Sequence, residues 1–326
     1  MKAIKRICVI GAGAIGSLCA GHLATVADVC VLTRRKEHAD QLNRKGLQIS
    51  GKSSLLSSVL ASANPEDLGE PDLVIIATKT TGVEQAARSV SGHFPKAMVL
   101  TIQNGMGCEE VVSRFGDWPV ISAVTFMSGI RQSDVHVHYE LDTETWMGPW
   151  AGAGASFEDA EQVAALFRAS GLKAKAFPDL LPAQWSKLIF NSVISSVAAV
   201  TELPHVVEFT QRESDSDLGN LVFEMMEEGK KVAAARNVIL HRDPWEMNVQ
   251  AIVKGQSRGK GYAHIASMLK DVWNQHPTEI DWITGSFVRE AAKVGIPVPL
   301  NRALYCLVKA REASWKYDAL KKEACA

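Results

Sequence analysis

Short apolar runs alternate with helix-periodic segments over roughly the first 179 residues. The runs are rich in valine and isoleucine and show little polar alternation, which is typical of strands covered on both faces. We expect such strands at residues 4–10, 29–33, 73–77, 98–102 and 120–126. Because helical patterns lie between them, the alternation predicts a parallel, doubly wound α/β sheet with right-handed crossovers.

From residue 180 onward the rhythm changes to long helical periodicities. Helices are predicted at residues 184–200, 218–236, 262–273, 279–294 and 301–319. The apolar pair at 238–239 is too short to anchor a sheet, and Pro178 and Pro182 are typical of a linker. We therefore expect two domains, residues 1–179 and an all-helical domain of residues 180–326, with a cleft between them.

Composition narrows the classes of partner. The 326 residues carry a formal net charge of −1 without a block of like charges, which disfavours a nucleic-acid or membrane-surface partner. No stretch approaches the roughly 20 apolar residues of a membrane span. The basic N-terminus before an apolar run resembles a secretory signal, but early glycines interrupt that run. With neither a signal nor a span, a reducing, cytoplasmic location is expected. The six cysteines form no C-x-x-C pair, so no metal site is predicted.

A glycine-rich turn follows the first predicted strand and opens a helix. It reads Gly11-Ala12-Gly13-Ala14-Ile15-Gly16. The first glycine permits the tight turn, the second lets backbone approach a pyrophosphate, and the third allows close helix–strand packing. A glycine-rich turn without a ligand is the alternative, but the strand–motif–helix–strand order favours a dinucleotide site.

The end of the second strand bears on the choice of nicotinamide cofactor. An NAD site usually carries an acid there to hold the ribose 2′-hydroxyl, whereas this chain reads Thr33-Arg34-Arg35-Lys36. A guanidinium can pair with a 2′-phosphate, so the sequence predicts NADPH/NADP⁺ with Arg34 as the first contact. A solvated basic loop is the alternative, and it is the stronger one for Arg35.

Two further loops leave the carboxyl ends of predicted strands, where open α/β sheets bind ligands. Lys79 follows the third strand and could meet a cofactor phosphate or ribose. Asn104 follows the fourth and could contact the nicotinamide or the substrate. Each is equally well explained, taken alone, as a polar turn residue.

The helical half places a lysine inside a largely apolar run. Lys187, Asn191 and Ser195 recur every four residues and so share one helix face. Such a lysine must extend to solvent, pair with an acid or serve chemistry. Downstream, Ser267 offers a hydroxyl and Glu279 a carboxylate, although Glu279 is also explained as a first-turn acid behind Pro277.

These pieces together resemble the ketopantoate reductase (2-dehydropantoate 2-reductase) family. They occur in the expected order over nearly the whole chain, and the C-terminal pieces are far more specific than the glycine turn. The matching pieces are Gly11 to Gly16, the Lys79 loop, Gln103-Asn104-Gly105, Trp185-x-Lys187-Leu188-x-x-Asn191, Ser267-Met268-Leu269-x-Asp271, Thr278-Glu279-Ile280-Asp281 with Gly285, and Gly295-Ile296-Pro297-Val298-Pro299-x-Asn301.

The resemblance implies an N-terminal NADPH-binding Rossmann domain and a helical domain like that of 6-phosphogluconate dehydrogenase. It makes Lys187 the general acid for a substrate carbonyl and places Glu279 opposite, contacting cofactor or substrate. It implies that Asn191 and Ser267 bind substrate oxygens and that Asn104 lies beside both ligands. It also implies that Gly129, which is expected in a loop after the fifth strand, lies near the nicotinamide. The implied reaction is NADPH-dependent reduction of 2-dehydropantoate to (R)-pantoate in pantothenate synthesis.

Three departures from the family pattern keep other functions open. Ser195 stands where a second substrate-binding asparagine is usual, while His205 and His264 replace other polar residues expected around the pocket. A site built on substrate hydrogen bonds discriminates strongly, so the same reduction of another 2-oxo acid or a bulkier ketone is the first alternative. A non-catalytic NADPH-binding sensor is an alternative of another class. The long helices would also permit a homodimer.

Overall fold

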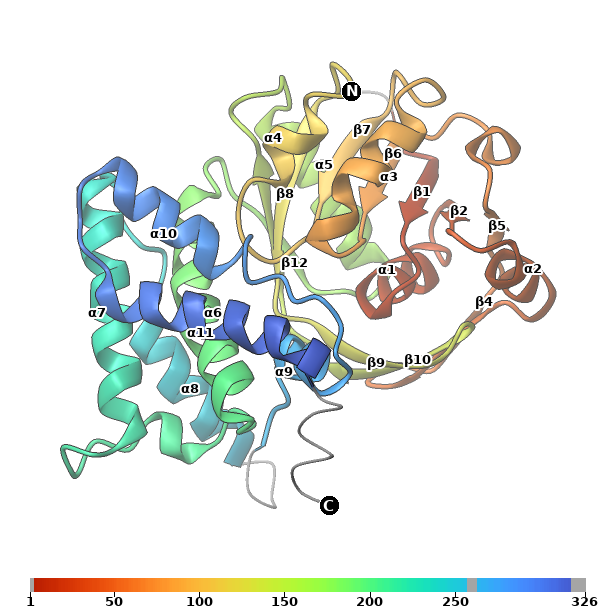
Figure 1. The fold of residues 1–326 in the computed structure, drawn as a ribbon. Coiled ribbons are helices and arrows are strands. Elements are labelled where there is room, and N and C mark those ends of the chain that lie inside the picture. The colour runs from red at the N-terminus through yellow and green to blue at the C-terminus, as the bar shows by residue number, and fades with distance from the viewer. Residues whose placement is uncertain (1–2, 257–262, 318–326) are drawn as a thin grey trace, which may run out of the picture. The chain divides into compact units, whose positions relative to one another are not determined.

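The computed structural model describes residues 3–256 and 263–317 (Figure 1). The chain forms two compact units. One comprises residues 1–103 and 107–180, and the other comprises residues 104–106 and 181–326. The short segment around Asn104 thus belongs with the helical residues, although its neighbours on both sides in sequence belong with the sheet.

The first unit is built on an eight-stranded sheet whose strand order is β12-β11-β8-β7-β6-β1-β2-β5. All neighbours pair in parallel except β11 with β8. The five predicted strands are confirmed within one or two residues at each end, as β1, β2, β6, β7 and β8. The bounds are β1 Arg6–Ile10, β2 Asp28–Leu32, β5 Leu60–Ser62, β6 Leu73–Ile76, β7 Met98–Thr101, β8 Val120–Thr125, β11 Thr145–Pro149 and β12 Ala174–Ala176.

The order of this sheet contains a topological switch point between β1 and β6. The chain moves outward from β1 to β2 and later returns to place β6 on the other side of β1. Ligands of open α/β sheets bind beyond the carboxyl ends of the strands at such a point. The covering helices are α1 Ala14–Leu23, α2 Lys36–Lys45, α3 Val83–Val90, α4 Cys108–Val112 and α5 Phe157–Ala169, with short 3₁₀ helices η1 Pro65–Leu68 and η2 Thr80–Gly82.

A second, four-stranded sheet of order β4-β3-β10-β9 was not predicted. Its strands are β3 Leu47–Gly51, β4 Leu55–Ser57, β9 Ser128–Ser133 and β10 His136–Leu141. Along β10, Val137 and Tyr139 are buried against the same apolar core as α1, while His136 and His138 occupy the alternate positions. One buried face therefore holds this small sheet in place.

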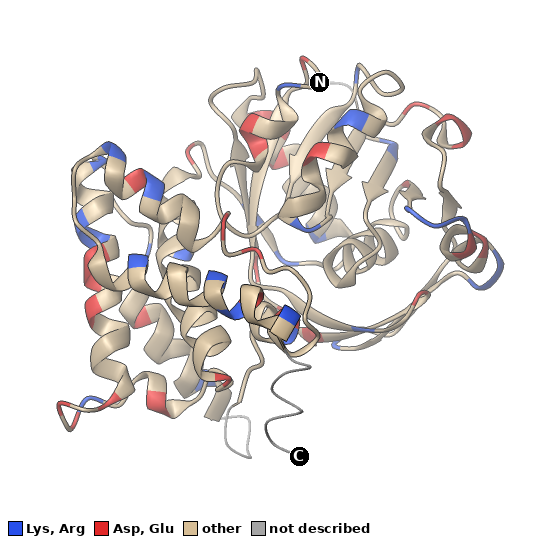
Figure 2. Ribbon diagram, viewed as in Figure 1, with Lys and Arg blue, Asp and Glu red and all other residues tan. Residues whose placement is uncertain are grey.

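The second unit is helical, as expected. Its helices are α6 Leu181–Thr201, α7 Leu218–Ala235, α8 Pro244–Gln256, α9 Ser267–Trp273, α10 Thr284–Lys293 and α11 Pro299–Ser314, with 3₁₀ turns η3 Val207–Phe209 and η4 Trp315–Tyr317. Within the described part of this unit, β pairing is limited to one isolated bridge between His205 and His264. Figure 2 shows that both charge signs are interspersed over the helices and the loops.

Several helix bounds differ from the prediction. Helix α8 was missed, α9 begins at Ser267 rather than near Tyr262, and α10 begins at Thr284 rather than Glu279. Tyr262 itself, the residues 318–319 predicted to end the last helix, and Cys325 lie outside the described residues. None of the described helices is both long enough and apolar enough to cross a bilayer.

Helix α6 is the centre of this unit, and the other helices pack against it. A Cβ added to Gly229 of α7 would lie 2.4 Å from a methyl of Ile189, so glycine permits the close approach of α7 to α6. The buried Glu228 carboxylate accepts the amides of Leu300 and Asn301 at 3.0 and 3.1 Å, which caps the start of α11. The motif ending at Asn301 thus fixes α11 on α7.

Candidate active site

The glycine turn at the switch point has the geometry that its spacing predicts. Gly11 has φ +97°, and a Cβ there would lie 2.9 Å from the backbone nitrogen of Thr78. A Cβ on Gly16 would lie 1.9 Å from the carbonyl oxygen of Gly11. Gly13 differs from both, because a Cβ there would have nothing within 4 Å. Packing therefore requires glycine at positions 11 and 16, whereas Gly13 has open space beside the turn.

Helix α1 starts at this open space. Gly13 is its N-cap, makes no side-chain cap hydrogen bond, and no acidic residue lies in the first turn. The amides at the start of a helix and the helix dipole attract an anion. Residues Gly11 to Gly16, with Ala12, Ala14 and Ile15, therefore fit the pyrophosphate of a dinucleotide.

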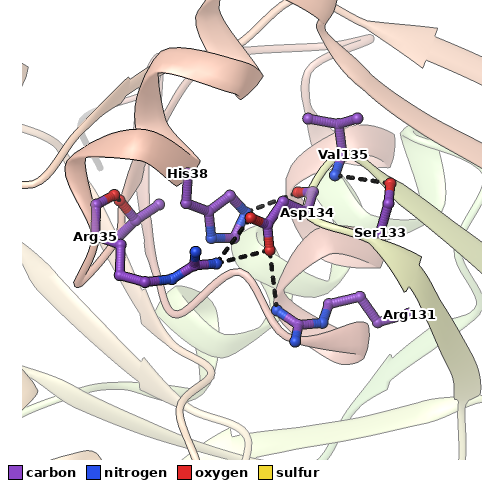
Figure 3. A network of polar contacts seen from close by, with 7 residues as sticks. Arg35, His38, Arg131, Ser133, Asp134 and Val135 are labelled. Carbon is purple, nitrogen blue, oxygen red and sulfur yellow. Dashed lines mark hydrogen bonds and ion pairs between the residues drawn. The ribbon is translucent and has the colours of Figure 1, made fainter.

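The loop from β2 to α2 carries the two arginines in different settings. Arg35 makes two hydrogen bonds of 2.7 and 2.8 Å to the Asp134 carboxylate, which Arg131 also approaches at 3.4 Å (Figure 3). His38 Nε2 lies 2.7 Å from the Asp134 carbonyl oxygen. The Arg35 guanidinium holds the pKa of Asp134 below its usual range. Asp134, which no sequence motif indicated, ties this loop to the β9–β10 turn.

Arg34 is exposed, and its side chain makes no ion pair or hydrogen bond with the described residues. Its charge therefore stays available at the carboxyl end of β2, while that of Arg35 is compensated by Asp134. This arrangement is compatible with the prediction from sequence that Arg34, rather than Arg35, is the first contact of a 2′-phosphate.

The loops after β6 and β7 meet beside the glycine turn. Lys79 is exposed and is the N-cap residue directly before η2. Gln103 donates from Nε2 to the carbonyl oxygens of Ile76 and Thr78 at 2.6 and 3.1 Å. Gln103 Oε1 and Thr78 Oγ1 are buried and have no hydrogen-bond partner among the described atoms. Such polar atoms are costly to bury alone, which makes them candidates for contact with a polar ligand.

Gly129 does not lie in a loop, so that part of the prediction is wrong. It is the second residue of strand β9, and a Cβ there would lie 3.1 Å from the carbonyl oxygen of His138 and 3.2 Å from a methyl of Leu18 in α1. The close packing of β9 on β10 and α1 explains the glycine without any ligand.

In the helical unit, one face of α6 carries the predicted residues in successive turns. Lys187 and Ser195 are each 7% exposed, and Asn191 is half-buried between them. Asn191 Nδ2 donates to Asn104 Oδ1 at 3.3 Å. The structure thus brings together two side chains that are 87 positions apart, and it leaves the Asn104 amide nitrogen to donate elsewhere.

Lys187 and Glu279 form an oppositely charged pair with little exposure. Burial lowers the pKa of Lys187 to about 7, and the Glu279 carboxylate acts in the opposite direction by favouring the ammonium. Glu279 is 9% exposed and lies in a turn five residues before α10. It is therefore not a first-turn helix acid, which was the competing explanation from sequence.

Ser267 is exposed and is the first residue of α9. The segment before it pairs with residue 205, because His205 N donates to the His264 carbonyl oxygen at 2.8 Å and His264 N returns a bond of 3.1 Å. His205 is 1% exposed, and its Nε2 lies 2.7 Å from Asn248 Oδ1. Burial lowers the pKa of His205 to about 4. This histidine is a neutral core residue, which differs from the pocket-lining role expected from sequence.

The chain is similar in sequence to proteins of one known family. A family model described as "Ketopantoate reductase PanE/ApbA" matches residues 7–152, and the one for its C-terminal part matches residues 179–312. The 2-dehydropantoate 2-reductase of Pyrococcus horikoshii is 30% identical over 309 residues, covering 94% of this chain and 98% of the relative.

Solved structures give the same fold. A PanE/ApbA family ketopantoate reductase from Ralstonia eutropha superposes with a TM-score of 0.82 at 26% identity, covering 95% of this chain and 99% of the other. A D-mandelate dehydrogenase, solved with NADH and anilino(oxo)acetate, gives the same TM-score and coverage at 21% identity. The second likeness extends only to the fold.

Proposed function

The chain belongs to the ketopantoate reductase family, and from this premise we propose that it reduces 2-dehydropantoate to (R)-pantoate with NADPH. The observation that carries the proposal is the buried Lys187, with a pKa lowered to about 7 beside Glu279. A general acid is most effective when its pKa lies near the working pH. In this unit Lys187 also shares a helix face with Asn191, which is bonded to Asn104.

The proposed chemistry assigns a task to each of these groups. A reduced nicotinamide, when bound, supplies the hydride that adds to the keto carbon. The Lys187 ammonium stabilises the negative charge that grows on the carbonyl oxygen and then donates its proton to that oxygen. Glu279 favours the protonated form of Lys187 and so opposes the effect of burial on its pKa. Excluding water strengthens both interactions.

The remaining polar groups of this unit serve substrate recognition in the proposal. Asn104 offers an amide donor to a substrate oxygen, since its own oxygen accepts from Asn191. Asn191, Ser195 and Ser267 would hold the hydroxyl and carboxylate oxygens. Accordingly, residues 180–326 together with the Asn104 segment form the substrate domain, and the rest of residues 1–179 forms the cofactor domain.

The cofactor assignment rests on the first unit. The open space at Gly13 and the uncapped start of α1 suit a pyrophosphate. The exposed Arg34 favours a 2′-phosphate, and hence NADPH over NADH. We also propose further cofactor contacts from Lys79, Asn104, Glu279 and the region of Gly129.

Steady-state oxidation of NADPH in the presence of ketopantoate tests the proposal directly. We expect saturable turnover that is lost in Lys187→Ala, with NADPH affinity retained. Turnover near background in the parent would remove this substrate. A parent that binds NADPH but reduces no 2-oxo acid would instead support the sensor alternative.

A second candidate function, reduction of a different 2-oxo acid, is favoured by Ser195. This residue is buried on the same face of α6 as Lys187, and its side chain is shorter than the asparagine expected there. It therefore leaves more room and offers fewer hydrogen bonds. If this departure redirects specificity, Ser195→Asn raises kcat/KM for ketopantoate and lowers it for bulkier 2-oxo acids; an unchanged ratio counts against this candidate.

A further inference from the structure

The turn that carries Glu279 is fastened at its beginning by an acid of α11. Thr278 donates to Glu312 Oε1 twice, from its backbone nitrogen at 2.8 Å and from its hydroxyl at 2.7 Å. Thr278 is buried, and the Glu312 side chain is 16% exposed. A charged acceptor for two donors makes this a strong attachment. It lies immediately before Glu279 in the chain.

The same turn is fastened again two residues after Glu279. The Asp281 carboxylate accepts from the Tyr305 hydroxyl at 2.6 Å and from Lys309 Nζ at 3.0 Å. Lys309 also lies 3.2 Å from Glu312 Oε2. One lysine of α11 therefore links the two carboxylates, one belonging to the turn and the other holding it.

Between the two attachments the turn is closed and buried. The Glu279 carbonyl oxygen accepts from the amides of Trp282 and Ile283, each at 3.0 Å. Ile280 is fully buried in one cluster with Val308 of α11. The backbone around Glu279 therefore has little freedom as long as α11 holds both ends of the turn.

The Asn104 segment rests on this turn as well. Met106 N donates to the Trp282 carbonyl oxygen at 3.1 Å. Gly105 has φ +93°, and a Cβ there would lie 2.1 Å from that same oxygen. Only glycine tolerates both the backbone conformation and the contact. The turn thus sets the place of Asn104, which in turn meets Asn191.

We propose that Glu312 of α11 is a positioning residue for the active site, which holds the turn at Thr278 so that Glu279 stays beside Lys187 and Asn104 stays seated. Glu312 touches neither of the proposed reacting groups and acts through the turn alone. The proposal rests on the proposed function for its kinetic consequences. Its structural part, the placement of Glu279, does not need that function.

The consequence concerns the proton on Lys187. Among the described residues, Glu279 is the charged group that acts on the Lys187 ammonium. If the turn loosens, that carboxylate moves away or becomes hydrated, and the Lys187 pKa falls further. The protonated form required for reduction then persists only to a lower pH.

The decisive variant is Glu312→Ala, compared with Glu312→Gln. In Glu312→Ala we expect kcat/KM near neutral pH to fall about tenfold and the alkaline decline of kcat/KM to move about one pH unit lower. Glu312→Gln keeps an oxygen that accepts both Thr278 hydrogen bonds, so we expect it to restore most of the activity and of the pH profile.

Glu290→Ala is the matched control. Glu290 is an acid of α10 whose side chain is 14% exposed and forms two ion pairs, with Arg236 at 3.3 Å and Lys293 at 2.5 Å. It lies outside the turn and α11. We expect a loss of stability without movement of the pH profile. Equal pH profiles in Glu312→Ala and Glu290→Ala would overturn the proposal.

A second variant and a measurement without substrate separate the positioning role from a failure to fold and from the proposed function. If Glu312→Ala does not fold, Thr278→Val is the second variant. It removes the hydroxyl bond to Glu312 and the 3.3 Å bond that Thr278 Oγ1 accepts from Ile280 N, with little change of volume. It keeps the backbone bond to Glu312, so we expect a shift of the same sign but smaller. NMR titration of the Lys187 amine in the full chain measures its pKa without substrate. An unchanged Lys187 pKa in Glu312→Ala or Thr278→Val refutes the positioning role, whereas absent turnover in the parent refutes only the proposed function.

Discussion

The two candidate sites of this protein are built from different materials. At the glycine turn, the geometry lies in the backbone, because Cβ atoms at Gly11 and Gly16 would collide with neighbouring backbone and one at Gly13 would not. In the helical unit, the proposed chemistry lies in two charged side chains, Lys187 of α6 and Glu279 of the turn before α10, that are each less than a tenth exposed. A backbone site needs only its local sequence, whereas a side-chain site depends on everything that buries it.

The largest expected effect separates chemistry from cofactor binding. Lys187→Ala removes the proposed proton donor, so we expect kcat/KM for the ketone to fall about 10³-fold, within the usual range for a general acid. NADPH affinity, measured by fluorescence titration, is expected to stay within about threefold because the glycine turn is untouched. A large loss of NADPH affinity would show that the two sites are less separate than their construction suggests.

The second prediction compares two glycines of one turn. Gly16→Ala places a methyl 1.9 Å from the Gly11 carbonyl oxygen, so we expect the free energy of unfolding to fall by about 3 kcal/mol. Gly13→Ala enters open space and is expected to cost less than about 1 kcal/mol. Urea denaturation measures both.

The ligand readout should rank these glycines differently from the stability readout. Gly13→Ala is expected to weaken NADPH binding about tenfold, since the methyl occupies the space proposed for the pyrophosphate. If Gly13→Ala binds NADPH like the parent, the open space has another purpose.

The third prediction follows the pKa of Lys187. Reduction needs the ammonium, and burial lowers its pKa to about 7, so kcat/KM for reduction is expected to fall about tenfold per pH unit above that value. Oxidation of the hydroxy acid needs the neutral amine and should rise over the same range. Glu279→Gln removes the charge that raises this pKa, so both limbs should move to lower pH. Rate profiles from pH 5 to 9 decide this, and a midpoint near the ordinary lysine pKa would contradict the buried setting.

The smallest expected effects concern the arginine pair. Arg34→Ala removes an exposed charge that faces no described carboxylate, so we expect NADPH to bind about tenfold more weakly and NADH to be unaffected. Arg35→Ala breaks a surface pair with Asp134, for which we expect less than about 1 kcal/mol of stability and a smaller change in NADPH affinity. Equal losses in the two variants would mean that Asp134 does not compensate Arg35.

The difference between local backbone geometry and long-range side-chain contacts also explains which parts of the fold could be predicted from sequence. The five buried strands and the glycine turn follow from local pattern, because strands covered on both faces are continuous apolar runs. The second sheet was not predicted because β9 has the sequence Ser-Gly-Ile-Arg-Gln-Ser, which lacks an apolar run, and is mostly exposed. Its partner β10 showed only the alternation of His136 and His138.

The start of α10 shows how periodicity can mislead. Ile280 and Ile283 are both buried and spaced as on one helix face, which made residues 279–283 look helical. The structure instead holds these residues in a turn, because Thr278 and Asp281 are bound to Glu312, Tyr305 and Lys309 far along the chain. No local signal reports such long-range bonds. The i,i+3 spacing of Lys309 and Glu312 was visible, but it is also what an ordinary exposed helix face presents.

The pocket-lining role predicted for His205 was also wrong because of a long-range contact. Its partner Asn248 lies 43 positions away on α8, a helix that was itself missed. Without that partner a histidine near the predicted pocket could only be interpreted as pocket lining. With it, the residue belongs to the core between Phe190 and Phe209.

The assignment of residues 104–106 to the helical unit has a practical consequence for dissecting the protein. A gene fragment cut near residue 180 would encode α6 to α11 without Asn104 and Met106. The bond from Asn191 Nδ2 to Asn104 and the bond from Met106 N to the Trp282 carbonyl oxygen would then be lost. Independent expression of the helical half therefore calls for adding this tripeptide back. The helical unit is therefore encoded by two separate stretches of the gene.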